Sequence, residues 1–214
     1  MSFLCNIVCN YLKSNAMLRY RFSVMLFAVS LLIVSCSTNS PDVIIETEMG
    51  DIGIKLYAEQ APVTVSNFMR YAESDRYSNL AQFYRVVTPS NQPNAKYKIA
   101  VIQGGFYSDS LIAAREFTPI EHENTAITGI KHTDGVISMA RAEIGTASSE
   151  FFICIGNQPE LDYGGQRNPD GQGFAAFGRV VKGMDIVRKI HGMQNENQYL
   201  TKPVRIVKIR RCLP

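Results

Sequence analysis

The stretch Phe83-Tyr84-Arg85-Val86-Val87 sets one arginine among aromatic and β-branched residues. Such residues favour a strand. A second apolar run, Ile99-Ala100-Val101-Ile102, leads into Gln103 and two glycines, and a polar loop over 88–98 with two prolines separates the runs. The pattern predicts two strands and places a permanently charged guanidinium on an otherwise apolar segment.

Similar segments continue on both sides of this pair. Residues 43–47 and 52–57 flank Gly50-Asp51, which predicts a β-hairpin. Further strands are expected at 135–141, 151–155, 174–181 and 204–209, and helices at 62–72, opened by Pro62, and 184–190. Residues 106–134 are expected to be mostly irregular. About eight short strands with two helices predict a mainly β fold, either a closed antiparallel barrel capped by the helices or a sandwich.

The composition suits one globular domain behind a leader. The chain has 214 residues, 46% of them hydrophobic, and shows no internal repeat. Its net charge of +3 comes from Lys13, Arg19 and Arg21, and the rest of the chain is neutral. A neutral body argues against binding to nucleic acid.

Residues 1–35 have the pattern of a signal peptide. Arg19 and Arg21 precede an apolar run over 22–34, which is shorter than the roughly 20 residues of a membrane span. Ile33-Val34-Ser35-Cys36 resembles the lipobox of bacterial lipoproteins, which implies lipidation of Cys36, a tether over 36–42 and a domain over 43–214. An ordinary signal peptide with an incidental cysteine is the alternative, and Met17 is an alternative start.

Five stretches in the domain, in this order and spacing, resemble the cyclophilins: Phe83-Tyr84-Arg85-Val86, Val101-Ile102-Gln103-Gly104-Gly105-Phe106, Ser138-Met139-Ala140-Arg141-Ala142, Glu150-Phe151-Phe152-Ile153 and residues 177–184. The resemblance implies an eight-stranded antiparallel barrel capped by two α-helices. It also implies peptidyl-prolyl cis-trans isomerase activity on proline-containing polypeptides, which needs no cofactor and no metal.

The resemblance assigns roles residue by residue. Arg85 matches the catalytic arginine of the family, and Gln103 matches a glutamine that hydrogen-bonds the substrate backbone. The other positions implied to bind substrate are Phe83, Val101, Arg141, Ala142, Glu150, Phe152, Leu161 and Phe174. Phe151, beside Phe152, is expected in the core.

Several positions depart from the family pattern. Tyr84 stands where the family usually has histidine, Arg141 replaces an asparagine, and Glu150 replaces a glutamine. Ala100 and Val101 fall where phenylalanine and methionine are usual, so a wider or shallower proline pocket is expected. We expect Glu150 to pair with Arg141 or Arg85.

The sequence also allows other functions. A cyclophilin-fold module that binds proline-containing segments with weak catalysis is the runner-up. His122, His132 and His191 form no metal-binding or hydrolase motif. Residues 162–171 only loosely resemble a calcium loop. Cys154 and Cys212 are expected to be free thiols, with a disulfide between them as the alternative. The expected protein is a monomer, anchored by Cys36 to a periplasm-facing membrane of the bacterial envelope.

Overall fold

The protein is described by a computed structural model that covers residues 40–212. The predicted signal peptide, the alternative start at Met17 and the predicted lipidation site Cys36 lie outside the described residues. The predicted tether lies outside them except for its last three residues.

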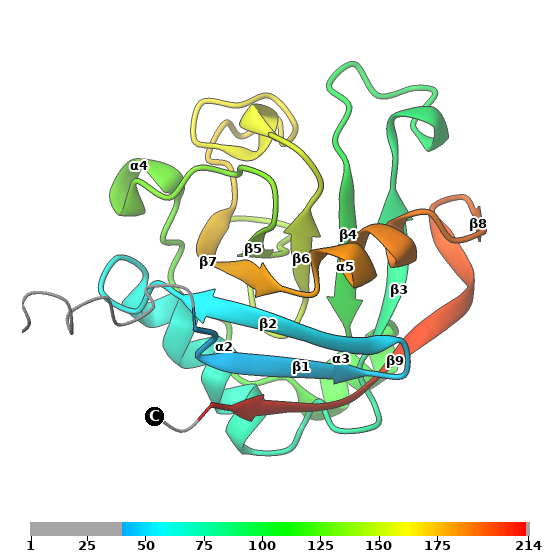
Figure 1. Ribbon diagram of the computed structural model, residues 1–214. Coiled ribbons are helices and arrows are strands. Elements are labelled where there is room, and N and C mark those ends of the chain that lie inside the picture. The colour runs from blue at the N-terminus through cyan, green and yellow to red at the C-terminus, as the bar shows by residue number, and fades with distance from the viewer. Residues whose placement is uncertain (1–39, 213–214) are drawn as a thin grey trace, which may run out of the picture. The chain divides into compact units, whose positions relative to one another are not determined.

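Eight antiparallel strands close into a barrel (Figure 1). Their order is β1-β2-β7-β5-β6-β4-β3-β9, and pairing of β1 with β9 closes the ring. A ninth, two-residue strand, β8, pairs only with β9. The strands are β1 (Val43–Thr47), β2 (Gly50–Leu56), β3 (Gln82–Val87), β4 (Val101–Gly105), β5 (Val136–Met139), β6 (Phe151–Cys154), β7 (Ala175–Lys182), β8 (Asn195–Glu196) and β9 (Tyr199–Arg211). The predicted closed eight-stranded barrel is confirmed.

Two longer helices and several short ones pack around these strands: α2 (Pro62–Glu73), α3 (Asp109–Arg115), α4 (Thr125–Thr128), α5 (Met184–His191), and the 3₁₀ turns η1 (Pro89–Asn91) and η2 (Pro159–Leu161). Pro62 opens α2, where its missing N–H costs nothing. The carboxylate of Glu123 accepts the backbone N–H groups of Val63 and Thr64 at 3.2 and 2.7 Å, which satisfies the free donors of that first turn.

The structure differs from the sequence-based expectation in two segments. Residues 106–134 are not wholly irregular, because Ser108 and Asn124 cap the short helices α3 and α4 with their side chains. The last strand begins at Tyr199 rather than near Val204, because its first residues form a hairpin with β8.

The barrel interior is a single apolar core with an aromatic centre. Phe68 of α2 lies 5.5 Å from the ring of Phe151 and 5.2 Å from that of Phe177. A second, smaller cluster lies apart from it and consists of Val87, Ile99, Val101, Phe152, Cys154 and Leu161, with Ala140 and Phe174 packed against it. No helix among the described residues combines the length and apolar character needed to cross a bilayer.

Candidate functional site

A cavity of about 160 Å³ opens over the smaller apolar cluster. It is lined by Arg85, Ile99, Val101, Gln103, Ala140, Arg141, Phe152, Leu161, Arg167 and Phe174. Seven residues predicted for the site therefore meet here: Arg85, Val101, Gln103, Arg141, Phe152, Leu161 and Phe174. Ile99, Ala140 and Arg167 were not predicted to line it.

Strand alternation explains the apolar wall. Successive side chains of a strand point to opposite faces, so Phe151 on β6 enters the main core while Phe152 faces the cavity. On β4, Ile102 points inward while Val101 and Gln103 point to the cavity. The ring of Phe174 meets that of Phe152 edge-on at 5.5 Å. Together with Leu161 these side chains form the apolar wall of the cavity, called the apolar cup below.

A β-bulge decides which residues of β3 reach this cup. Both partners of β3 shift register between Phe83 and Arg85. Phe83 is fully buried in the main core, 5.8 Å from the ring of Phe151, and does not line the cavity. The implied pocket position of Phe83 is therefore corrected to a core position. The bulge turns Arg85 to the outer face, opposite Gln103.

The Arg85 guanidinium is held by two amides. Its Nη1 donates to Gln103 Oε1 at 2.9 Å, and its Nε and Nη2 donate to Gln198 Oε1 at 3.1 and 2.5 Å. Gln198 lies in the turn between β8 and β9 with φ of 76°. Among the described residues no carboxylate pairs with Arg85, so its charge stays available to a ligand.

A chain of hydrogen bonds runs behind Arg85. Gln103 Nε2 donates to the Tyr84 hydroxyl at 2.7 Å, and this hydroxyl donates to Glu150 Oε2 at 2.7 Å. The other oxygen of Glu150 accepts the Phe106 N–H at 2.6 Å. Burial raises the pKa of Glu150, and burial beside that carboxyl raises the pKa of Tyr84. The hypothesis that Glu150 pairs with Arg141 or Arg85 is wrong: Glu150 lies behind the cavity wall and meets Arg85 only through two intervening side chains.

The positive charge of Arg141 is neutralised by a neighbouring carboxylate. Its guanidinium makes two hydrogen bonds to the Asp170 carboxylate, at 2.7 and 2.9 Å, and two to the Gly173 carbonyl. The Arg141 side chain is only 1% exposed and holds the pKa of Asp170 at about 2. Ala142, also implied to bind substrate, does not line this cavity and lines a separate hollow together with Asp170.

His132 supports the apolar wall from behind. Its ring stacks on Phe152 with centroids 6.0 Å apart, and its nitrogens lie 2.8 Å from Asp162 Oδ1 and 3.0 Å from Ser138 Oγ. Burial lowers the pKa of His132, which favours the neutral ring. Ser138 is fully buried, so no substrate reaches its hydroxyl and this Ser–His–Asp set is structural.

The structure also bears on the calcium-like segment and on the disulfide considered from the sequence. Asp162 and Asp170 of the calcium-like segment are committed to His132 and Arg141, and no group of three His, Cys, Asp or Glu side chains suited to a metal occurs within residues 40–212. Cys154 and Cys212 are free thiols, so the alternative of a disulfide between them is wrong.

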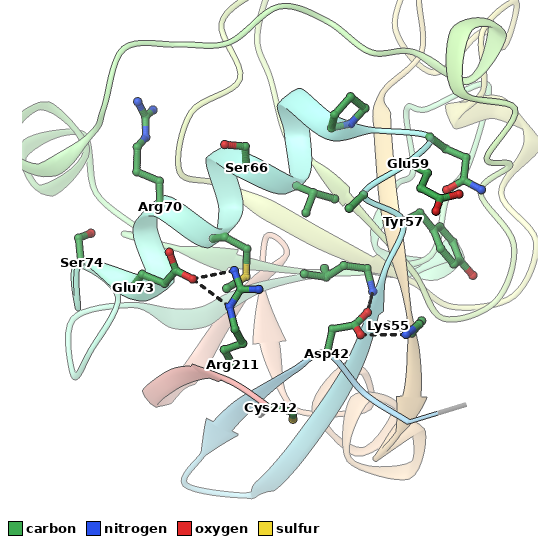
Figure 2. A pocket seen from close by; sticks show the side chains of 16 residues that line it. Asp42, Lys55, Tyr57, Glu59, Ser66, Arg70, Glu73, Ser74, Arg211 and Cys212 are labelled. Carbon is green, nitrogen blue, oxygen red and sulfur yellow. Dashed lines mark hydrogen bonds and ion pairs between the residues drawn. The ribbon is translucent and has the colours of Figure 1, made fainter. Parts of the chain in front are cut away.

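A larger hollow of about 1100 Å³ lies elsewhere, beside α2 and the ends of β2 and β9 (Figure 2). Four of its charged side chains form two ion pairs: Lys55 pairs with Asp42 at 2.8 Å and Arg211 with Glu73 at 2.7 Å. None of the residues predicted for the site lines it. The smaller cavity therefore remains the candidate site.

Comparison with known proteins agrees with this geometry. The family described as "Cyclophilin type peptidyl-prolyl cis-trans isomerase/CLD" matches residues 42–212. Peptidyl-prolyl cis-trans isomerase A of Dickeya dadantii is 36% identical over 162 residues, which cover 75% of this chain and 76% of that protein. Peptidyl-prolyl cis-trans isomerase B of Escherichia coli is 34% identical over 148 residues, covering 69% of this chain and 82% of that protein.

A solved structure shows the same fold. A cyclophilin type peptidyl-prolyl cis-trans isomerase of Cryptosporidium parvum, crystallised in the presence of the dipeptide Ala-Pro, superposes with a TM-score of 0.63. The two are 20% identical, and the match covers 80% of this chain and 99% of that one. With the family match over nearly all of the described residues, the chain belongs to the cyclophilin family and is a peptidyl-prolyl cis-trans isomerase.

Proposed function

We propose that this isomerase uses Arg85 to stabilise the twisted prolyl amide of a polypeptide whose proline ring occupies the apolar cup. Rotation about an Xaa–Pro bond faces a barrier of about 18–20 kcal/mol because resonance keeps the amide planar. In the twisted state the prolyl nitrogen regains its lone pair. A cation aimed at that nitrogen lowers the barrier, because it binds the twisted state more strongly than the planar one.

The observation that carries this proposal is the shared cavity. Arg85 lines the same 160 Å³ space as Phe152, and two glutamine amides orient its guanidinium without cancelling its charge. Gln103 has its oxygen on Arg85 and its nitrogen on Tyr84, so its own orientation is set from both sides. In our proposal Gln103, Arg141 and Phe174 border the peptide, and Val101, Phe152 and Leu161 hold the proline ring.

Exchange spectroscopy on a short Xaa–Pro peptide tests the role of Arg85. The Arg85→Ala variant should lose about a hundredfold in kcat/KM, as expected when one preorganised donor is removed, while it still binds the peptide. Arg179→Gln is the matched control, since Arg179 is exposed on β7 and does not line the cavity. Full turnover in Arg85→Ala would overturn the assignment. Peptide binding by a wild type with no measurable turnover would favour the binding-module alternative.

We further propose that the protein acts as a monomer on exported polypeptides, anchored by lipid on Cys36 to a periplasm-facing membrane. The short apolar run before Ile33-Val34-Ser35-Cys36 supports this proposal. Labelling with an alkyne-bearing fatty acid in a bacterial host should mark the wild type. The Cys36→Ser variant should stay unlabelled and leave the membrane fraction, whereas Cys154→Ser keeps the label. Equal labelling of wild type and Cys36→Ser would contradict the anchor.

A further inference from the structure

The rim of the cavity carries a further arginine, besides Arg85 and Arg141, to which the proposed reaction assigns no role. Arg167 lies in the loop between η2 and β7, and its side chain lines the cavity together with Arg85. The loops after β3 and after β6 both rise along the upper side of the barrel in Figure 1. Arg167 bridges them, because its Nη1 donates to the Tyr97 carbonyl at 3.0 Å.

The loop that carries Arg167 is braced by its own backbone. Phe174 N donates to the Leu161 carbonyl at 3.0 Å, which closes the loop at its base, and Arg167 N donates to the Glu160 carbonyl at 3.1 Å. At Gly165 a Cβ atom would lie 2.5 Å from the Glu160 carbonyl oxygen, so the tight fold of this loop depends on that glycine. The position of Arg167 over the cavity is therefore built into the loop.

The charge of Arg167 has no partner within the described residues. Its side chain makes one hydrogen bond there, to a backbone carbonyl, and no ion pair. In the described part of the chain Arg85 likewise hydrogen-bonds only neutral amides, whereas Asp170 neutralises Arg141. Burial and the positive charge of Arg85 both lower the pKa of Arg167, so the two guanidinium groups repel each other across the site. A half-buried cation beside a second cation is costly unless an anion joins them.

We infer that Arg167 is a specificity-determining residue that selects polypeptides with an aspartate or glutamate next to the proline. This inference rests on the proposed use of the cavity for the proline ring. A carboxylate one residue away from that ring would lie near both guanidinium groups and relieve their repulsion. Within residues 40–212 only one N–H group of the Arg167 guanidinium is bonded, and the remaining donors have the fork geometry that matches a carboxylate.

Matched peptides measure this selectivity. Two pairs are compared, one with Glu or Gln before the proline and one with Glu or Gln after it. Each kcat/KM is divided by the uncatalysed rate of the same peptide. For at least one position the wild type should prefer Glu by about fivefold at low ionic strength, the size expected for a partly exposed charge-assisted pair. The preference should shrink as salt is added.

Variants of the loop identify the residue responsible. Arg167→Gln should bring the Glu-to-Gln ratio to about one, and Arg167→Lys should retain part of the preference as a point charge. Arg179→Gln removes the same charge from an exposed site on β7 and should leave the ratio as in the wild type. A wild-type ratio near one at both positions, or a ratio unchanged in Arg167→Gln, would overturn the inference.

Titration of the same peptides by NMR separates this inference from the proposed function. If the wild type accelerates none of the peptides, the proposed mechanism fails. The dissociation constants of the Glu and Gln peptides then still test Arg167. Tighter binding of the Glu peptide that disappears in Arg167→Gln supports the inference, and equal binding of both peptides refutes it.

Discussion

Removal of a single hydroxyl, in Tyr84→Phe, should weaken both the fold and the site. Phenylalanine keeps the ring, which stacks on Tyr199 at 6.3 Å. The variant loses the hydrogen bond to Glu150 and the one from Gln103, both 2.7 Å long. Glu150 then keeps two donors, the Phe106 N–H and the Ser149 hydroxyl.

The size of the effect follows from these two bonds. A hydrogen bond to a charged group contributes about 1.5–3 kcal/mol and a neutral one about 1 kcal/mol, and Tyr84 is only partly buried. We expect the free energy of unfolding to fall by about 2 kcal/mol. For a slope of roughly 2 kcal/mol per molar urea, the midpoint of unfolding moves down by about 1 M. Because Gln103 loses the acceptor that fixes its nitrogen, we expect kcat/KM to fall by about tenfold.

Urea denaturation measures the loss of stability, and exchange spectroscopy measures the loss of kcat/KM. The double variant Tyr84→Phe with Glu150→Gln removes the stranded carboxylate charge, so it should recover much of the stability while turnover stays low. A Tyr84→Phe protein with unfolding free energy within about 0.5 kcal/mol of the wild type and unchanged kcat/KM would refute the role assigned to this hydrogen-bond chain.

Three further predictions concern the walls of the barrel and the cavity. Phe151→Ala should cost about 3–5 kcal/mol of stability, whereas Phe152→Ala should mainly weaken peptide binding in an NMR titration; similar losses of stability in both would contradict their opposite orientation. Burial lowers the pKa of His132 below its ordinary value of about 6.5, so below that pH the unfolded chain binds a proton that the folded protein does not. The urea midpoint should therefore fall as the pH drops below about 6.5. In His132→Gln this part of the pH dependence should vanish, and an unchanged dependence of the midpoint on pH would contradict the role of His132. Gly173 has φ of 63° and a Cβ there would lie 2.5 Å from the Asp162 carbonyl carbon, so Gly173→Ala should lower the melting temperature and disturb the Arg167 loop, and a wild-type melting curve would contradict this.

The sequence pattern by itself predicted about eight strands in a barrel or a sandwich, and the resemblance of its motifs to the cyclophilins selected the barrel and most of the side chains that meet in the cavity. Apolar runs indicate which segments are buried. The motif around Arg85 spans only a few neighbouring residues, so it can be recognised without the tertiary structure. The resemblance assigned Phe152 to the pocket and left Phe151 in the core, and strand alternation in the structure explains why the two side chains face opposite ways.

Only the tertiary structure decided which of these residues share a surface and which neighbours hold them. The bulge that sends Phe83 inward and Arg85 outward depends on the registers of both partner strands. Gln198 lies 113 positions from Arg85, Glu150 lies 66 positions from Tyr84, and Arg167 meets Tyr97 across 70 positions. Such hydrogen bonds cannot be predicted from the periodicity of the sequence, because their partners lie far apart in the chain and meet only when the barrel closes.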